Sequence, residues 1–318
     1  MSKTAKKIEV EIMKEKIEKI EELKRKKGAV ILAHYYCRPE VQEVADFLGD
    51  SLALSVKARD IEAKTILFAG VHFMGETAKV LSPEKKVLIP NPEATCSLAE
   101  SCKAEKLAEM KAKYPNALVV AYVNTTVGVK ALTDICCTSS NALQVVESIP
   151  QDKEILFVPD KNLGSYIQKV TGRKMILWDG ACHVHEKFSK EGILELKKLN
   201  PEAKVVVHPE CRGEVADLAD YCGSTAGILS YCGKSDCDTF IVVTEPGILA
   251  EMEKKYPQKK FIPAPSVEGK ACNECEYMKM ITLESIIACL EKESPTIELD
   301  EEVRKKASKS IEEMVKIG

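Results

Sequence analysis

The sequence predicts an α/β protein with parallel sheets, arranged as three domains of one kind. Short apolar runs that can form buried parallel strands alternate with amphipathic segments that can form helices. Three of these runs lead to a cysteine, at Cys96, Cys182 and Cys275, and the cysteines are separated by 86 and 93 residues. A repeat of this length is too long for a solenoid, so it favours three similar α/β domains.

The composition is that of a folded protein with solvated helical faces. The chain has 318 residues, of which 45% are hydrophobic and 30% are charged. Two or three domains are expected at this length. The net charge of −3, with both signs interspersed, gives no reason to expect a nucleic-acid or membrane partner. No window approaches the roughly 18 apolar residues of a membrane span.

The thirteen cysteines bear on the compartment and on metal binding. Residues 1–27 are a run of Lys and Glu without the apolar core of a signal peptide. A cysteine-rich chain with no sign of secretion is expected in a reducing compartment, where thiols bind metals rather than form disulfides. We therefore expect a cytoplasmic protein.

The first unit is expected to begin with an amphipathic helix at 3–27 and a buried strand at 29–33 that delivers His34 and Tyr36 at its carboxyl end. Pro39 should open a helix that continues through Phe47, and residues 46–50 are expected to form a short strand or turn. Ser51 should cap a helix that runs to about Ile61. A strand, a helix and a strand then lead to Cys96, at 65–69, 72–81 and 86–90.

The second and third units repeat this plan. After a helix from Leu98 to Tyr114, the second unit has expected strands or strand-like segments at 117–124, 134–139, 154–158 and 174–178, before Cys182. The third has them at 203–208, 220–225, 240–244 and 260–263, before Cys275. The predicted domains are residues 1–98 with 276–318, residues 99–183, and residues 184–275. The two terminal helices, at 3–27 and 300–317, are expected to pack together on the first domain.

Spacing within the units supports the repeat and predicts a shared site. Seventeen residues separate His34 from Ser51, Tyr122 from Ser139 and His208 from Thr225, and an aspartate lies five residues before each hydroxyl, at Asp46, Asp134 and Asp220. Ligands of parallel α/β sheets bind outside the carboxyl ends of the strands. A threefold packing would bring these ends and the three cysteines to one cavity. Hydroxyls at helix starts would there suit a ligand with several carboxylates or a phosphate.

Polar side chains at matched strand ends are candidates for acid–base chemistry: His34, Tyr36, Tyr122, Asn124, His208 and Glu210. Any one of them could be a satisfied buried polar group. Six at matched places in three units favour a site, and a His and a Glu two residues apart suit proton transfer.

The three cysteines leave three possibilities for a metal. A [4Fe–4S] cluster on three thiolates keeps one iron open as a Lewis acid. Structural zinc takes four ligands, often from Cys-x-x-Cys pairs, and the chain has one such pair, Cys272-Asn-Glu-Cys275. The third possibility is that no metal is bound.

A series of motifs, in order over nearly the whole chain, resembles those of quinolinate synthase. They are Ile31-Leu-Ala-His34-Tyr-Tyr36, Phe47-Leu-Gly-Asp-Ser51, Glu93-Ala-Thr-Cys96, Tyr122-Val-Asn124, Cys137-Thr-Ser-Ser-Asn141, Pro159-Asp-Lys-Asn-Leu-Gly164, Gly180-Ala-Cys-His-Val-His185, His208-Pro-Glu-Cys211, Gly223-Ser-Thr225 and Cys275-Glu-Tyr-Met278. The resemblance implies three three-layer αβα domains around a pseudo-threefold axis. It also implies a [4Fe–4S] cluster on Cys96, Cys182 and Cys275. Cys275 is preferred to Cys272 because the Tyr-Met-Lys-Met that follows it resembles the family's segment after its ligand.

The resemblance further implies a transferase that condenses iminoaspartate with dihydroxyacetone phosphate to quinolinate, with release of phosphate and water, in NAD biosynthesis. Tyr36 and Glu210, with His34 and His208, would form the catalytic set. Carboxylate or phosphate groups would be held by His34, Ser51, Tyr122, Asn124, Ser139, His208, Glu210, Ser224 and Thr225. A transient partner that supplies the unstable iminoaspartate is compatible with this reaction.

Two other functions stay open at this point. One is a [4Fe–4S] hydro-lyase that acts on a small di- or tricarboxylate. The other is a metal-bearing protein that binds a carboxylate without catalysis. His208 and Glu210 beside the expected metal ligands favour an enzyme.

Overall fold

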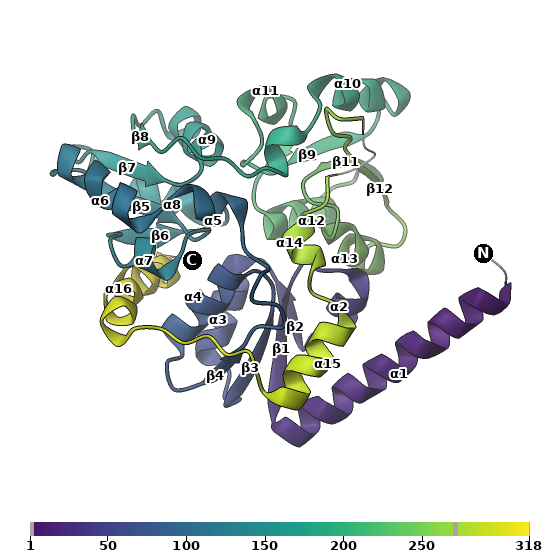
Figure 1. The fold of residues 1–318 in the computed structure, drawn as a ribbon. Helices are drawn as coiled ribbons and strands as arrows, with labels where there is room; N and C mark the ends of the chain where they lie inside the picture. The colour runs from purple at the N-terminus through teal and green to yellow at the C-terminus, as the bar shows by residue number, and fades with distance from the viewer. Residues whose placement is uncertain (1–2, 270–272, 318) are drawn as a thin grey trace.

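The computed structural model describes residues 3–269 and 273–317, which form three lobes around a common centre (Figure 1). Each lobe contains one parallel four-stranded sheet flanked by helices, and the strand orders are β2-β1-β3-β4, β6-β5-β7-β8 and β10-β9-β11-β12. In every sheet the first strand of the lobe pairs with the second on one side and with the third on the other. This confirms the predicted α/β class and the three similar domains.

The first lobe, residues 29–88, has a core of fully buried strands. Its β3 (Thr65–Ala69) is buried along its whole length, as expected for a strand with helices on both faces. The other elements are β1 (Ala29–His34), α2 (Pro39–Glu43), β2 (Phe47–Gly49), α3 (Ser51–Asp60), α4 (His72–Leu81) and β4 (Lys86–Leu88).

The second and third lobes, residues 97–177 and 185–263, repeat this order. The second contains α5 (Ser97–Ser101), α6 (Ala104–Lys113), β5 (Leu118–Tyr122), α7 (Val127–Lys130), β6 (Ile135–Cys137), α8 (Ala142–Ser148), β7 (Ile155–Val158), α9 (Lys161–Thr171) and β8 (Ile176–Leu177). The third contains η1 (His185–Lys187), α10 (Lys190–Leu199), β9 (Lys204–Val207), α11 (Gly213–Ala216), β10 (Tyr221–Cys222), α12 (Thr225–Lys234), β11 (Thr239–Val243), α13 (Ile248–Lys255) and β12 (Lys260–Pro263). The domain boundaries given above remain a prediction.

The aspartates at matched positions in the three units each connect the first two strands of their lobe. A carboxylate oxygen of Asp46 accepts the backbone N–H of Ile31 at 2.7 Å, and Asp134 does the same for Val119. Asp220 accepts from Val205, again at 2.7 Å. Each aspartate lies just before the second strand of its lobe and ties it to the first. The shared spacing in the sequence therefore reflects one repeated backbone interaction.

Three helix boundaries differ from the prediction. Helix α2 ends at Glu43 rather than Phe47, because Phe47 already belongs to β2. The expected helix from Leu98 to Tyr114 is two helices, since Cys102 and Lys103 have extended backbone between α5 and α6. The cap of α3 is Asp50, whose carboxylate accepts the N–H of Ala53 at 3.0 Å; Ser51 is the first helical residue.

The pairing predicted for the terminal helices is wrong. Helix α1 (Lys3–Lys27) packs along α15 (Leu283–Lys292), with ion pairs from Lys19 to Glu291 and Lys27 to Glu293. Helix α16 (Glu301–Ile317) instead lies against α7 and β6 of the second lobe and α4 of the first. The long connection after α15 carries α16 across to the second lobe (Figure 1).

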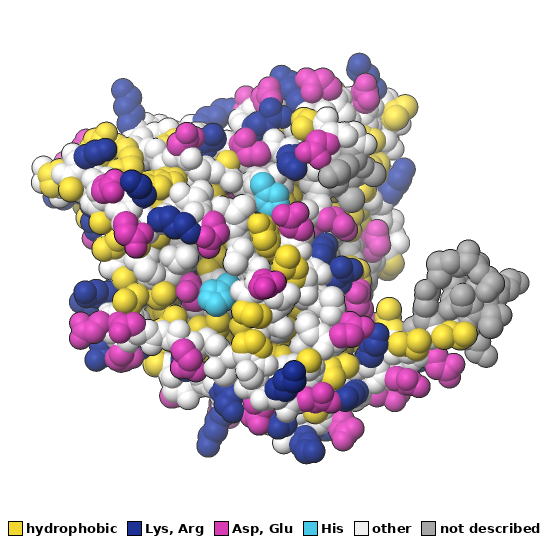
Figure 2. All heavy atoms as spheres, viewed as in Figure 1, with side chains coloured by type: hydrophobic (Ala, Val, Ile, Leu, Met, Phe, Trp, Pro, Cys, Tyr) yellow, Lys and Arg dark blue, Asp and Glu magenta, His cyan; other side chains and the backbone are white. Residues whose placement is uncertain are grey.

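The N-terminal part of α1 projects beyond the lobes (Figures 1 and 2), and Ile8, Val10, Ile12 and Met13 are exposed there. On the face drawn in Figure 2, acidic and basic side chains are interspersed. No helix in the described part of the chain is long and apolar enough to cross a membrane.

Candidate active site

A cavity lies where the carboxyl ends of β1, β5 and β9 meet, and all three lobes line it. Its walls enclose about 680 Å³, part of which is open to solvent. It is lined by every predicted site residue except Ser224, namely His34, Tyr36, Ser51, Cys96, Tyr122, Asn124, Ser139, Cys182, His208, Glu210, Thr225 and Cys275. The structure thus brings together residues that are up to 241 positions apart (275 − 34).

Two histidines occupy equivalent places in the first and third lobes. The Nδ1 atom of His34 accepts the backbone N–H of Tyr36 at 3.1 Å, and that of His208 accepts the N–H of Glu210 at 3.4 Å. Burial lowers the pKa of both imidazoles to about 3. A neutral ring that accepts at Nδ1 carries its proton on Nε2. The Nε2 of His208 can therefore donate to the Ser139 hydroxyl, 3.2 Å away.

The matched hydroxyls lie at or just before helix starts. Ser51 and Thr225 are the first residues of α3 and α12, and Ser139 lies two residues before Asn141, the residue that precedes α8. Ser224 has a different environment, because its hydroxyl oxygen accepts the backbone N–H of Gly227 at 3.0 Å and so caps α12. Ser224 is not among the described residues that line the cavity.

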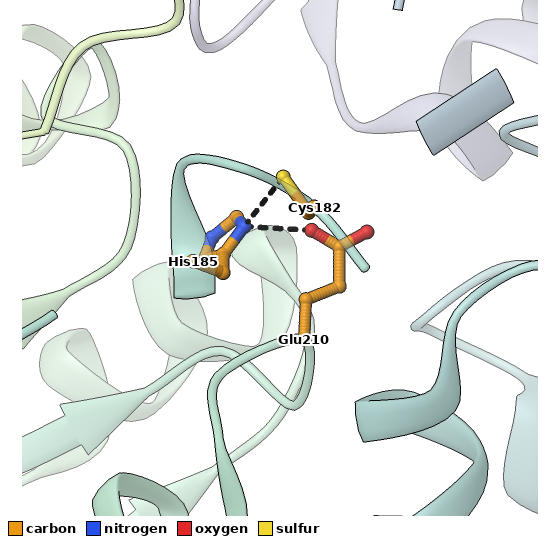
Figure 3. A group of neighbouring side chains, drawn as sticks. All are labelled: Cys182, His185 and Glu210. Carbon is orange, nitrogen blue, oxygen red and sulfur yellow. Dashed lines mark hydrogen bonds and ion pairs between the residues drawn. The ribbon is translucent and has the colours of Figure 1, made fainter. Parts of the chain in front are cut away.

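The carboxylate of Glu210 lies in the cavity wall among hydrogen-bond donors. Figure 3 shows the ring of His185 beside Cys182 and Glu210, with His185 Nδ1 at 2.7 Å from Glu210 Oε2 and 3.2 Å from Cys182 Sγ. Burial acts to raise the pKa of Glu210. The electrostatic interactions with His185 and His208 and the hydrogen bond from His185 outweigh it and hold the pKa below its usual value. Glu210 is therefore a buried carboxylate that accepts hydrogen bonds.

Asn124, at the equivalent position in the second lobe, points its amide at Glu210. Its Nδ2 donates to Glu210 Oε1 at 3.5 Å. Its Oδ1 is buried and has no hydrogen-bond partner among the residues that the structure describes. A buried amide oxygen without a partner loses its hydration without compensation, so it marks a place for a ligand donor.

Tyr36 faces the cavity as a neutral phenol. Its hydroxyl lies 2.7 Å from Thr225 Oγ1 and 2.7 Å from Thr244 Oγ1. Burial raises the pKa of Tyr36 well above its usual value, although the two threonine hydrogen bonds act in the opposite direction. The group can therefore donate a proton, whereas Glu210 can accept one.

The three cysteines reach the cavity on loops that follow the last strand of each sheet. The backbone N–H of Cys182 donates to Asp160 Oδ2 at 3.2 Å, and that of Cys275 donates to Glu245 Oε1 at 3.1 Å. Burial raises the pKa of Cys96 to about 12 and that of Cys275 to about 11. Cys272, the alternative ligand, lies outside the described residues.

The spacing of the ligand atoms bears on which metal group fits. Among the described residues, the set that could hold one metal ion is Cys182, His185 and Glu210, whose ligand atoms lie within 4.8 Å of one another. The three cavity cysteines do not form such a set. The three thiols line one cavity but, as they lie in the described structure, they are not grouped closely enough to hold one ion together.

Four buried residues at the site were not predicted: Asp160, His185, Thr244 and Glu245. Asp160 and Glu245 follow the third strand of their lobes, 38 residues after Tyr122 and 37 after His208. This near-equal spacing could have identified them. His185 stands in the Cys182-His-Val-His185 motif that carried the resemblance. Thr244 had no signal in the sequence, because a threonine at a strand end is common.

Comparisons with known proteins place the chain among related sequences. The family model described as Quinolinate synthetase A protein matches residues 18–316. A quinolinate synthase of Prochlorococcus marinus is 52% identical over 296 residues, which cover 93% of this chain and 89% of the relative. One of Microcystis aeruginosa is 51% identical over 299 residues, 94% of each chain. One of Chloroherpeton thalassium is 51% identical over 302 residues, 95% of this chain and 94% of the relative.

A match over almost the whole chain includes every cysteine and polar residue that lines the cavity. The chain belongs to the Quinolinate synthetase A family.

Proposed function

We propose that this protein condenses iminoaspartate with dihydroxyacetone phosphate to give quinolinate, phosphate and water, as a transferase of NAD biosynthesis. The observation that carries the proposal is one cavity that combines a thiol from each of three loops with a buried acid–base pair and several neutral hydrogen-bond donors. Formation of a carbon–carbon bond, cyclisation and loss of water all need protons moved at one site with anionic groups held in place.

Cys96, Cys182 and Cys275 would hold a [4Fe–4S] cluster in this proposal. Three protein ligands are one fewer than the four irons of such a cluster, so when bound it would supply one Lewis-acidic iron for a carboxylate or hydroxyl oxygen. The remaining chemistry belongs to the side chains of the chain itself.

Tyr36 and Glu210 would divide the proton transfers. Glu210 is held as a carboxylate by His185, so it would accept a proton from substrate carbon or nitrogen. Tyr36 stays protonated because burial raises its pKa, so it would donate to a leaving or carbonyl oxygen. Two groups whose environments push their pKa values apart are the usual arrangement for acid and base in one site.

The carboxylates and the phosphate would be bound by neutral donors. His34 and His208 carry a proton on Nε2, and Ser51 and Thr225 lie where the free N–H groups of α3 and α12 begin. Helix starts of this kind bind anions through backbone N–H groups and the helix dipole. The unpaired Oδ1 of Asn124 would accept from an amino or hydroxyl group of the substrate.

Anaerobic purification followed by metal analysis and an assay for quinolinate tests the proposal. We expect a brown protein with about four irons and four sulfides per chain that forms quinolinate from the two substrates. Iminoaspartate would be generated in the assay by a second enzyme, which also tests whether a partner must supply it.

Two outcomes would contradict the proposal. Colourless, active protein with stoichiometric zinc would exclude the cluster. Brown protein that dehydrates a small hydroxy acid and never forms quinolinate would favour a hydro-lyase.

A further inference from the structure

Thr244 lies directly behind the cavity wall, at the carboxyl end of β11. It is the first residue after the strand, its exposed fraction is 2%, and it is not one of the described residues that line the cavity. Its hydroxyl oxygen lies 2.7 Å from the hydroxyl of Tyr36 and 3.0 Å from Nε2 of His185. One buried hydroxyl thus contacts Tyr36 of the first lobe and His185 in η1, at the start of the third.

These contacts join the two groups of the proposed acid–base pair. His185 bonds Glu210 through its Nδ1 atom and Thr244 through its Nε2 atom. Thr244 bonds Tyr36, and Tyr36 bonds Thr225 on the other side. The result is an unbroken series of hydrogen-bonded side chains, all buried except the half-buried Tyr36: Glu210, His185, Thr244, Tyr36 and Thr225. Such a series restrains every member, because each rotation breaks a hydrogen bond to a neighbour in the series.

The donors and acceptors along this series are consistent with each other. A carboxylate can only accept, so His185 donates to Glu210 from Nδ1. The Nε2 atom of His185 lies 3.0 Å from the Thr244 hydroxyl, which can serve as either donor or acceptor to the ring. The lone pairs of Thr244 are then free to accept the proton of Tyr36. A hydroxyl at position 244 can be donor or acceptor to both neighbours, whereas the methyl groups of a valine can be neither.

We infer that Thr244 is a positioning residue that holds Tyr36 and His185, and through His185 the carboxylate of Glu210, in one fixed arrangement across the cavity. The expected effect on catalysis rests on the proposed function. The positioning of the side chains does not depend on it. Misplacement of a reacting group by about 1 Å can cost on the order of a hundredfold in rate. Loss of the hydroxyl should therefore lower kcat without weakening the binding of either substrate.

Three substitutions distinguish the contribution of the Thr244 hydroxyl from that of its methyl group. Thr244→Val keeps the shape and loses the hydroxyl, Thr244→Ala loses both groups, and Thr244→Ser keeps the hydroxyl alone. Thr77→Val is a matched control, because Thr77 is equally buried and donates to Phe73 O within α4. All would be purified with their metal, and iron content and melting temperature would be measured first.

In the valine and alanine variants we expect kcat and kcat/KM to fall together, by roughly tenfold or more, with KM and iron content unchanged. Thr244→Ser and Thr77→Val should keep nearly the wild-type kcat. The inference is overturned if the valine and alanine variants are as active as wild type, or if serine loses as much activity as alanine. Wild-type protein that forms no quinolinate would refute the proposed function instead.

A crystal structure of the alanine variant tests the geometry whether or not quinolinate forms. The Tyr36 and His185 rings should move from the places they occupy in the wild-type chain. Rings that stay in place would show that Thr244 does not position them, and this would overturn the inference independently of any assay.

Discussion

The first and third lobes place different chemistry on the same backbone. In both, a buried histidine lies at the carboxyl end of the first strand and accepts the backbone N–H of the residue two positions on. That residue is Tyr36 in the first lobe and Glu210 in the third. One is a phenol whose pKa burial raises, and the other is a carboxylate held ionised by His185.

The aspartates just before the second strand of the same two lobes are alike in both residue type and contact. Asp46 and Asp220 each accept one backbone N–H of the adjacent strand at 2.7 Å. The aspartates that bind the backbone are therefore repeated, whereas Tyr36 and Glu210, which face the cavity from equivalent positions, differ. A site made of three identical lobes would present three identical groups, and an acid and a base need different ones.

The largest effect should follow removal of a cavity cysteine. Cys182→Ala should lose most of its iron and all quinolinate formation, because two thiols do not hold a four-iron cluster. The control is Cys289→Ala, which should keep its iron. Cys289 is buried in α15, away from the cavity. Metal analysis and far-ultraviolet circular dichroism measure metal and fold separately. Unchanged iron in the first variant would remove Cys182 from the ligand set.

Substitution of Glu210 or of Tyr36 should have the next largest effect. Glu210→Gln keeps the size of the side chain and loses its negative charge, so substrate and metal binding should survive. The kcat should fall by on the order of 10² to 10⁴, the usual contribution of a general base. Tyr36→Phe should lose activity on a similar scale for want of a proton donor. Steady-state kinetics measure both, and a fully active Glu210→Gln would exclude Glu210 from proton transfer.

His34 and His208 should make the free energy of unfolding depend on pH in the same way. Their pKa is about 3 in the folded chain and about 6.5 when unfolded. Between pH 7 and pH 5 the unfolded chain takes up protons that the folded chain does not, so the free energy of unfolding falls as pH falls. The loss at pH 5 is about 2 kcal/mol for each histidine.

Urea unfolding at several pH values measures this dependence. The variants His34→Gln and His208→Gln should each lose a similar part of the wild-type slope, and the double variant should lose both parts. A single variant with the full wild-type slope would show that its histidine is protonated in the folded state.

The smallest effect should come from the repeated aspartates. Asp134→Ala and Asp220→Ala each leave one strand N–H without its acceptor, which costs about 1 kcal/mol. Asp46→Ala should cost more, because Asp46 also pairs with the buried Lys24 at 2.9 Å. Shifts in the urea midpoint measure the three, with the exposed Asp152→Ala as control. Equal losses at all three positions would show that the Lys24 ion pair contributes nothing.

Much of the site could be predicted because it repeats. His34, Tyr122 and His208 stand at equal distances from the hydroxyls at 51, 139 and 225, and all six line the cavity. The pairing of the terminal helices was predicted wrongly, because an amphipathic face shows that a helix packs but not against what. Asp50 rather than Ser51 caps α3, because the carboxylate one position earlier accepts the N–H of Ala53.

The sequence by itself determined the class of fold, the three units and the residues that each unit brings to its strand ends. These follow from short-range rules: apolar periodicity, turn residues and a spacing that recurs three times. Only the tertiary structure decided how the residues act on each other. His185, Thr244 and Tyr36 are 59 and 208 residues apart along the chain at their two contacts. No local pattern encodes such distances, because they result from the packing of whole lobes around a buried centre.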